Sequence, residues 1–136
     1  MRGLLPLSNQ AIEDELNSNR DVISPPASFA YLIALRALRK PILVITASSK
    51  AAEDLAKEIH ELHTDTLEFP AWETLPHERL SPSSDTVAKR ISTLHSLKEQ
   101  KKNWVVVAPI RAVIHKFNAQ IVDTEAITVD RGLEFD

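Results

Sequence analysis

The stretch "ILVITASSKAAEDLAKEIHEL", residues 42–62, decides the fold class because it joins two segments of different periodicity. Residues 42–47 form a continuous apolar run rich in β-branched side chains, which is typical of a strand covered on both faces. Residues 48–62 then place apolar side chains at helical spacing between acidic and basic ones. Either Ser48 or Ser49 can cap the start of this helix. The stretch therefore predicts a buried strand followed by an amphipathic helix.

The same alternation of strand and helix continues along the chain. A second strand of the buried type is predicted over residues 104–108, and a shorter strand over residues 65–69, with a helix over residues 85–101 between them. Crossovers of this length imply a parallel sheet. The sequence therefore predicts an α/β fold, a mainly parallel sheet flanked by helices, in which residues 42–46 and 104–108 are interior strands.

The remaining elements lie toward the two ends of the chain. We predict helices over residues 8–18, 28–40 and 110–117, a short buried strand over residues 21–24 and a last strand over residues 126–130. The helix at 28–40 is apolar almost all round, so it should be buried on more than one side. The final stretch begins an element that it does not finish. We expect residues 1–125 to form one α/β lobe and residues 126–136 to begin a following domain of a longer protein.

The composition excludes several classes of function. The 136 residues contain no cysteine, which excludes disulfides and thiol catalysis and fits a cytoplasmic protein. No run approaches the ~20 apolar residues of a membrane-spanning helix. The net charge of −3 argues against a domain whose main task is to bind phosphates, so this part alone is not expected to bind DNA.

No pattern in the sequence indicates catalysis or a metal site. There is no G-x-S-x-G motif around a nucleophile. His60 and His63 are three residues apart on a predicted helix, but no second pair of ligands completes a metal site, and we expect both to be solvated. We therefore predict no catalytic residue, no metal ligand and no cofactor.

Residues 22–38 form a turn and a helix where an open α/β sheet would hold a phosphate-binding loop. A working loop, G-x-x-x-x-G-K-[ST], needs glycines so that backbone N–H groups surround the phosphates, and a lysine for charge. In its place stand Ser24, Pro25, Pro26, Ala27 and Ser28. The two prolines remove two N–H donors. The sequence therefore predicts a degenerate loop that binds no nucleotide.

The stretch "FPAWETLPHERLSPSSD", residues 69–85, is a long loop between a strand and a helix. Its three prolines keep the backbone extended, and its large apolar groups are expected to pack back onto the domain. Either the loop is an Ω-type loop fixed to the core, or it is a surface that meets another domain or nucleic acid. In that segment Arg79, Asp85 and Arg90 are candidates for ion pairs. The possible domain-contact residues are Trp72, Glu73, Leu75, Pro76, Arg79, Ser83, Asp85 and Arg90.

At this loop the sequence resembles a known family. "FPAWETLPHERLSPSSDTVAKRISTLHSL", followed by "WVVVAPIRAVIHKF", is similar to the N-terminal region of bacterial transcription-repair coupling factor (Mfd). The excision-repair protein UvrB has a related stretch, in which an aromatic-rich hairpin grips DNA, and this sequence lacks those tyrosines. The resemblance implies a UvrB-like first lobe, a helicase-like P-loop NTPase lobe whose nucleotide site is lost.

The resemblance also implies a role and partners. The chain would be a catalytically silent scaffold that helps to recruit nucleotide-excision repair to stalled RNA polymerase. UvrA would bind through an adjoining domain, and RNA polymerase and DNA through downstream regions that include an ATP-dependent translocase motor. In this family the loop at residues 69–85 would be a packing and domain-contact segment. The alternative function is a nucleotide- or DNA-handling α/β enzyme domain.

Overall fold

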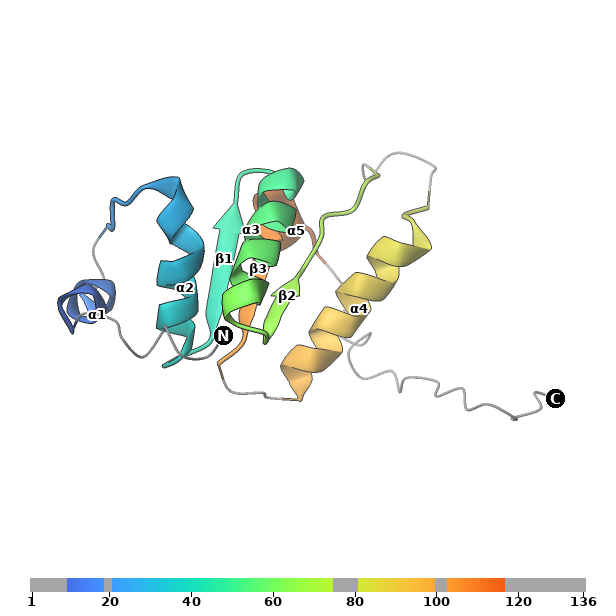
Figure 1. Cartoon of the computed structure of the whole chain (residues 1–136). Coiled ribbons are helices and arrows are strands. Elements are labelled where there is room, and N and C mark those ends of the chain that lie inside the picture. Colours follow the sequence, from blue (N-terminus) through green and yellow to red (C-terminus); the bar gives the residue numbers. More distant parts are fainter. Residues whose placement is uncertain (1–9, 19–20, 75–80, 100–102, 117–136) are drawn as a thin grey trace.

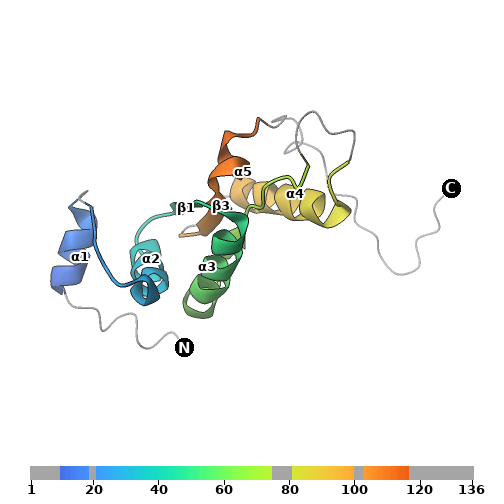
Figure 2. The same cartoon turned by 90° about the horizontal axis from the view of Figure 1, so that it is seen from above.

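The structure is a computed structural model that describes residues 10–18, 21–74, 81–99 and 103–116. In chain order the elements are α1 (Gln10–Asn17), η2 (Pro26–Ser28), α2 (Phe29–Ala37), β1 (Ile42–Thr46), α3 (Ser49–Leu62), β2 (Thr66–Glu68), α4 (Ser84–Lys98), β3 (Val105–Pro109) and α5 (Ile110–Ile114). Figure 2 shows α2 and α3 on one side of the sheet and α4 and α5 on the other. The predicted α/β fold with a parallel sheet between helices is confirmed.

The described strands form one parallel sheet in the order β1-β3-β2 (Figure 1). Ile42 of β1 and Thr66 of β2 are both aligned with Val105, so β3 separates the other two strands along their whole length. All five residues of β3 are buried, which explains their β-branched and small side chains. The prediction of β3 as an interior strand is confirmed.

The two faces of the sheet hold separate apolar cores. One core lies under α2 and α3 and contains Ala34, Ile59 and alternate residues of β3, Val105 and Val107. The other core contains Phe69, Ala71, Val106, Ala108 and Ala112, with Leu94 and Leu97 of α4 packed against it. Because successive side chains of β3 point to opposite faces of the sheet, β3 contributes buried residues to both cores.

Serine caps position the two long helices. Ser48 Oγ accepts a hydrogen bond of 3.2 Å from the backbone N–H of Ala51 at the start of α3, and Ser83 Oγ accepts one of 3.2 Å from Thr86 N at the start of α4. Each cap satisfies an N–H group that the helix itself cannot use. Of the two serines that the sequence offered as the cap of α3, the first, Ser48, is the cap.

Two predictions about strands are wrong. β1 is the edge strand of the described sheet, and Leu43 and Ile45 are 51% and 50% exposed, because α4 covers the β2 side of that face rather than the β1 side. Residues 21–24, predicted as a short buried strand, are not a strand, and Ile23 is 99% exposed. Within the described residues no strand pairs with this segment, which runs directly into Pro25. The strand predicted over residues 126–130 lies outside the described residues.

Asn103, two residues before β3, has a left-handed backbone conformation and contacts the ends of α2 and α3. Asn103 has a φ of 70°, a region that asparagine tolerates better than most residues. Its Nδ2 donates to the backbone oxygen of Leu38, just after α2, over 3.2 Å. Its own backbone oxygen lies 2.5 Å from Nε2 of His63, the residue after α3. His63, expected to be solvated, is therefore part of the turn that places β3 beside both helices.

Candidate domain-contact site

The candidate site is the base of the long loop, where residues 69–73 leave β2 and where Ser83 caps α4, whose first part is residues 84–93. The buried residues of α4 are Thr86, Arg90 and Thr93, which are four and three positions apart and therefore share one face of the helix. This buried face is polar. It makes hydrogen bonds to the segment after β2 that an apolar face could not make.

Arg90 lies at the centre of this face, and its guanidinium lies close to the faces of two aromatic rings. The guanidinium carbon is 4.0 Å from the centroid of the Phe69 ring and 4.3 Å from that of Trp72. Nη1 donates a hydrogen bond of 2.6 Å to the backbone oxygen of Pro70, while Nη2 is buried without a hydrogen-bond partner. The residue is only 3% exposed, and burial lowers the pKa of the guanidinium. The aromatic faces therefore take the place of a carboxylate as the partners of this cation.

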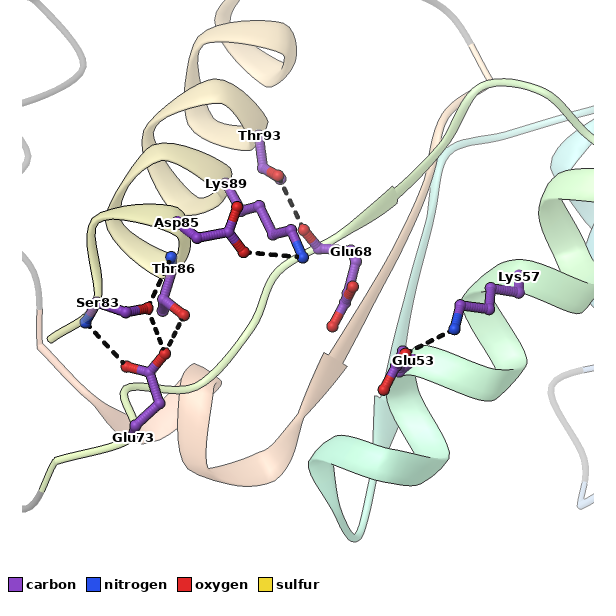
Figure 3. A network of polar contacts seen from close by, with 9 residues as sticks. All are labelled: Glu53, Lys57, Glu68, Glu73, Ser83, Asp85, Thr86, Lys89 and Thr93. Carbon is purple, nitrogen blue, oxygen red and sulfur yellow. Dashed lines mark hydrogen bonds and ion pairs between the residues drawn. The ribbon is translucent and has the colours of Figure 1, made fainter.

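Glu73, in the segment after β2, forms hydrogen bonds with residues at the start of α4. Its carboxylate accepts hydrogen bonds from Thr86 Oγ1 and from Ser83 Oγ, the second over 2.7 Å, and a longer one of 3.4 Å from the backbone N–H of Ser83 (Figure 3). These bonds, that from Thr86 first, lower the pKa of Glu73 to about 2. The carboxylate also sits at the N-terminus of α4, where the helix dipole favours negative charge. Glu73 thus ties the start of the loop to the start of the helix.

A third contact fixes α4 to the sheet itself. Thr93 Oγ1 donates a hydrogen bond of 2.9 Å to the backbone oxygen of Glu68, the last residue of β2 (Figure 3). Farther toward the N-terminus of α4, Lys89 Nζ lies 3.3 Å from Asp85 Oδ2 in an exposed i,i+4 ion pair. The two ends of the loop are therefore held together by side chains of three turns of one helix.

The turn at Ser24–Ser28 uses its own hydrogen-bond donors. The backbone N–H and the Oγ of Ser28 both donate to the backbone oxygen of Pro25, over 2.9 and 2.7 Å. The N–H of Phe29 is directed to the backbone oxygen of Pro26. Since Pro25 and Pro26 carry no N–H, the turn presents few free donors to an incoming phosphate.

Comparison with known proteins places the chain in a family. No protein-family model matches it. It is 38% identical over 117 residues to the transcription-repair-coupling factor of Mycobacterium tuberculosis, a match that covers 80% of this chain and 10% of the relative. The proteins of the same name from Escherichia coli and Haemophilus influenzae are 31% and 32% identical over 94 and 75 residues, which is 66% and 54% of this chain and 8% and 6% of theirs.

The chain belongs to the transcription-repair-coupling factor family. It spans about a tenth of the length of the Mycobacterium tuberculosis relative. The resemblance seen in the sequence is therefore confirmed at the level of the family.

The structure brings together part of the loop set that the sequence suggested for this family member. Trp72, Glu73, Ser83 and Arg90 meet at the loop base, whereas Asp85 is exposed and pairs with Lys89 instead of Arg90. Of the ion pairs considered among Arg79, Asp85 and Arg90, one between Asp85 and Arg90 does not form, because the Arg90 guanidinium lies over the aromatic rings. More than half of the surface of Trp72 is buried, which agrees with the prediction that the large apolar groups of the loop pack back onto the domain. Leu75, Pro76 and Arg79 lie outside the described residues.

Sequence reasoning missed the roles of Thr86 and Thr93, because the aliphatic residues at helical spacing, Val87, Ile91, Leu94 and Leu97, predict a different buried side for this helix. Among the aliphatic residues, Ile91, Leu94 and Leu97 are only partly buried. A usable signal existed: Thr86, Arg90 and Thr93 repeat at the spacing of one helix face, opposite a segment that contains two aromatic residues. In α4 these polar residues contact the end of β2 and the segment after it, while Leu94 and Leu97 pack against the apolar core.

Two further findings concern the described part of the chain. None of its helices combines the length and the apolar composition that a membrane crossing requires. Its His, Asp and Glu side chains nowhere gather in groups of three or more that could hold a metal ion.

Proposed function

We propose that this chain is a scaffold lobe of a transcription-repair-coupling factor and that its loop base presents a surface to another domain of the longer protein. The observation that carries the proposal is that the charged side chains Arg90 and Glu73, near the carboxyl end of β2, are both engaged in contacts within the loop base. In open α/β sheets this end of the strands is where ligands usually bind. Here Arg90 is enclosed by Phe69 and Trp72, and Glu73 accepts hydrogen bonds from Ser83 and Thr86. Both charged groups hold the loop, so neither is free to act on a substrate.

The proposal includes catalytic silence of this lobe. ATP phosphates are normally bound by backbone N–H groups and a lysine. The Ser24–Ser28 turn contains two prolines and no lysine, and Ser28 directs its N–H and hydroxyl to Pro25. These features support a degenerate loop that holds no nucleotide. ATP-dependent translocation along DNA would then belong to other regions of the longer protein.

The partners follow from the family. In the longer protein, a bacterial cytoplasmic repair factor, UvrA would bind through an adjoining domain, and RNA polymerase and DNA through other regions. The lobe would act by holding those regions in place while nucleotide-excision repair is recruited to a stalled polymerase. With a net charge of −3, this chain releases few counterions on binding DNA, which argues against a direct role in holding the duplex.

The test compares binding by the 136-residue chain with binding by the full-length factor. Calorimetry with ATP and Mg²⁺, a pull-down with UvrA and fluorescence anisotropy with duplex DNA should each show no binding by the chain at micromolar concentration and physiological salt. Binding of ATP that is abolished by changing Ser24 and Ser28 would favour a nucleotide-handling enzyme domain instead. Sub-micromolar binding of UvrA or DNA by the chain alone would contradict the scaffold proposal.

The loop-base part of the proposal has a separate test in the full-length factor. Glu73→Gln and Ser83→Ala loosen the loop base without touching the apolar cores, so the lobe should remain folded by circular dichroism. We expect weaker protection of the loop base from proteolysis and a reduced coupling of repair to transcription. The matched control is Glu61→Gln, on the exposed face of α3. Unchanged coupling in both loop-base variants would show that the loop is not a domain contact.

A further inference from the structure

The outer edge of β2 borders an open groove. In the described sheet β2 pairs with β3 alone and therefore lies at an edge (Figure 1). The groove, of about 400 Å³, lies between this edge and α4. It is lined by Thr66, Leu67 and Glu68 of the strand and by Ala88, Lys89, Ser92 and Thr93 of the helix. A strand edge beside a groove is a place where a further strand can be added.

The backbone groups of β2 alternate between β3 and the groove. Asp65 and Phe69, the residues before and after β2, form backbone hydrogen bonds of 3.0 and 2.9 Å to β3. In a strand, residues two positions apart direct their backbone groups to the same side. The backbone groups of Thr66 and Glu68 therefore point away from β3, toward the groove.

One of these outward groups is already engaged, and this favours one direction for an added strand. The backbone oxygen of Glu68 accepts a hydrogen bond of 2.9 Å from Thr93 Oγ1. For the N–H of Glu68 and the backbone oxygen of Thr66, the described residues supply no hydrogen-bond partner. A parallel strand uses this pair, because its residue aligned with Leu67 donates to Thr66 and accepts from Glu68. An antiparallel strand would compete with Thr93 for the oxygen of Glu68.

The edge of the groove carries an excess of negative charge. Lys89 Nζ lies 3.3 Å from Asp85 Oδ2, and Lys57 Nζ lies 2.6 Å from Glu53 Oε1. Glu68 lies between these two pairs in Figure 3, and no described cation forms an ion pair with it. The pKa of Lys89 is raised by its hydrogen bond to Asp85 first and also by the charge of Glu68, so one ammonium group serves two carboxylates. A basic residue beside Glu68 would balance this charge.

The two faces of the sheet set the side chains of an added strand. Aligned residues of neighbouring strands point to the same face. Leu67 packs against the core under α4, so the residue aligned with it would point toward Ala88 and Ser92 and should be apolar. The next residue would be aligned with Glu68 and should be Lys or Arg.

We propose that this groove binds, as an added parallel strand, an extended segment in which an apolar residue precedes Lys or Arg, and that another region of the longer factor supplies it. An edge of three residues gives few hydrogen bonds, so a segment of a separate protein would bind weakly. A tethered segment is present at millimolar effective concentration. The chain spans 10% of the Mycobacterium tuberculosis relative, which leaves most of that length as a possible source. The inference rests on the proposed function only in placing the strand within the longer protein.

The first experiment titrates the ¹⁵N-labelled 136-residue chain with the peptide acetyl-Ser-Thr-Val-Lys-Ser-amide. We expect saturable shifts of the amide signals of residues 66–69, 88 and 92 at millimolar peptide, and none at Leu16 or Ile33 of the opposite core. The same peptide with Glu in place of Lys should bind about fivefold more weakly, because it places like charges side by side. A peptide methylated at the Val nitrogen keeps the charge but cannot donate to Thr66, so it should not bind.

Variants of the chain separate backbone pairing from charge. Glu68→Pro removes the N–H that faces the groove and should abolish binding, whereas Glu68→Gln should remove only the preference for the Lys peptide over the Glu peptide. Thr66→Pro is the matched control, because it removes an N–H that a parallel strand does not use, and the peptide should still bind. Thermal unfolding checks that the variants are folded; if a proline variant unfolds, the methylated peptide still tests the pairing. Binding that survives Glu68→Pro but not Thr66→Pro would overturn the parallel arrangement.

The second experiment tests the source of the strand by residue-resolved hydrogen exchange. The N–H of Glu68 should exchange at least about tenfold more slowly in the full-length factor than in the 136-residue chain. Equal exchange would overturn the assignment of the strand to the longer protein. No saturable shift, or equal binding of the methylated peptide, would overturn strand addition itself. Shifts of the same amides when the chain alone is concentrated would assign the edge to a second copy instead.

A loop-base variant keeps this proposal apart from the scaffold role. Glu73→Gln changes the loop base and leaves every residue that lines the groove in place. We expect it to alter neither the peptide titration nor the exchange of the Glu68 N–H. The groove and the loop base can therefore fail their tests separately.

Discussion

Replacement of Trp72 by alanine should cost this lobe a few kcal/mol of folding free energy. Truncation of a large aromatic side chain in a core costs ~3–5 kcal/mol. Trp72 is only partly buried, so its packing loss is smaller, about 2 kcal/mol. Arg90 also loses one of its two aromatic faces, which adds ~1 kcal/mol for a desolvated cation–π contact. The expected total is about 3 kcal/mol, or a fall in Tm of roughly 10 °C for a domain of this size.

The assay is thermal and urea unfolding followed by far-UV circular dichroism. Trp72→Phe is the matched control, because it keeps an aromatic face over Arg90 and should lose less than half as much stability. A double-mutant cycle of Trp72→Ala with Arg90→Met isolates the contact between them, with an expected coupling energy of ~1 kcal/mol. An unchanged Tm in Trp72→Ala, or a coupling energy of zero, would refute the idea that the ring stabilises the buried cation.

Three further predictions concern the loop base and the sheet. The pKa of Glu73 is lowered to about 2, below its value in the unfolded chain, so its contribution is present at neutral pH and lost as pH falls from about 5 toward 2; Glu73→Gln should abolish that part of the pH dependence, whereas Glu61→Gln should not. Ser83→Ala removes both the cap of α4 and the partner of Glu73, and should lower stability in urea by about 1–2 kcal/mol. Ile45→Thr on the exposed face of β1 should cost less than ~1 kcal/mol, while Val107→Thr in the buried central strand should cost more than ~2 kcal/mol; equal costs would mean that the edge strand and the central strand are buried alike.

The regular elements were predictable because local patterns define them. The apolar run of β3 and the amphipathic stripe of α3 indicate strand and helix without knowledge of their neighbours, and Ser48 and Ser83 mark the helix starts. The sequence could not indicate which strand lies at an edge. The run at β1 looks like that of a doubly covered strand, but coverage depends on where α4 packs, which is a tertiary property.

The candidate site was predictable in membership but not in its interactions. The prolines and Trp72 marked the loop as a packed segment, and Glu73, Ser83 and Arg90 were among the residues named for it. Charge pairing suggested ion pairs among Arg79, Asp85 and Arg90, since opposite charges are the simplest guess from sequence. The actual partners are ring faces and a backbone oxygen, which depend on how the chain bends after β2.

The strand order β1-β3-β2 has a consequence for how the lobe folds during synthesis. β1 and β2 are made first, but each pairs only with β3, which comes last of the three. No pair of strands in the described sheet can therefore form until the ribosome has delivered residues 105–109. Until then the segments of β1 and β2 on either side of α3 remain unpaired, and their exposed apolar side chains can associate with other chains. We expect a nascent chain halted before residue 105 to depend on chaperones, and one halted well beyond residue 116 to resist protease.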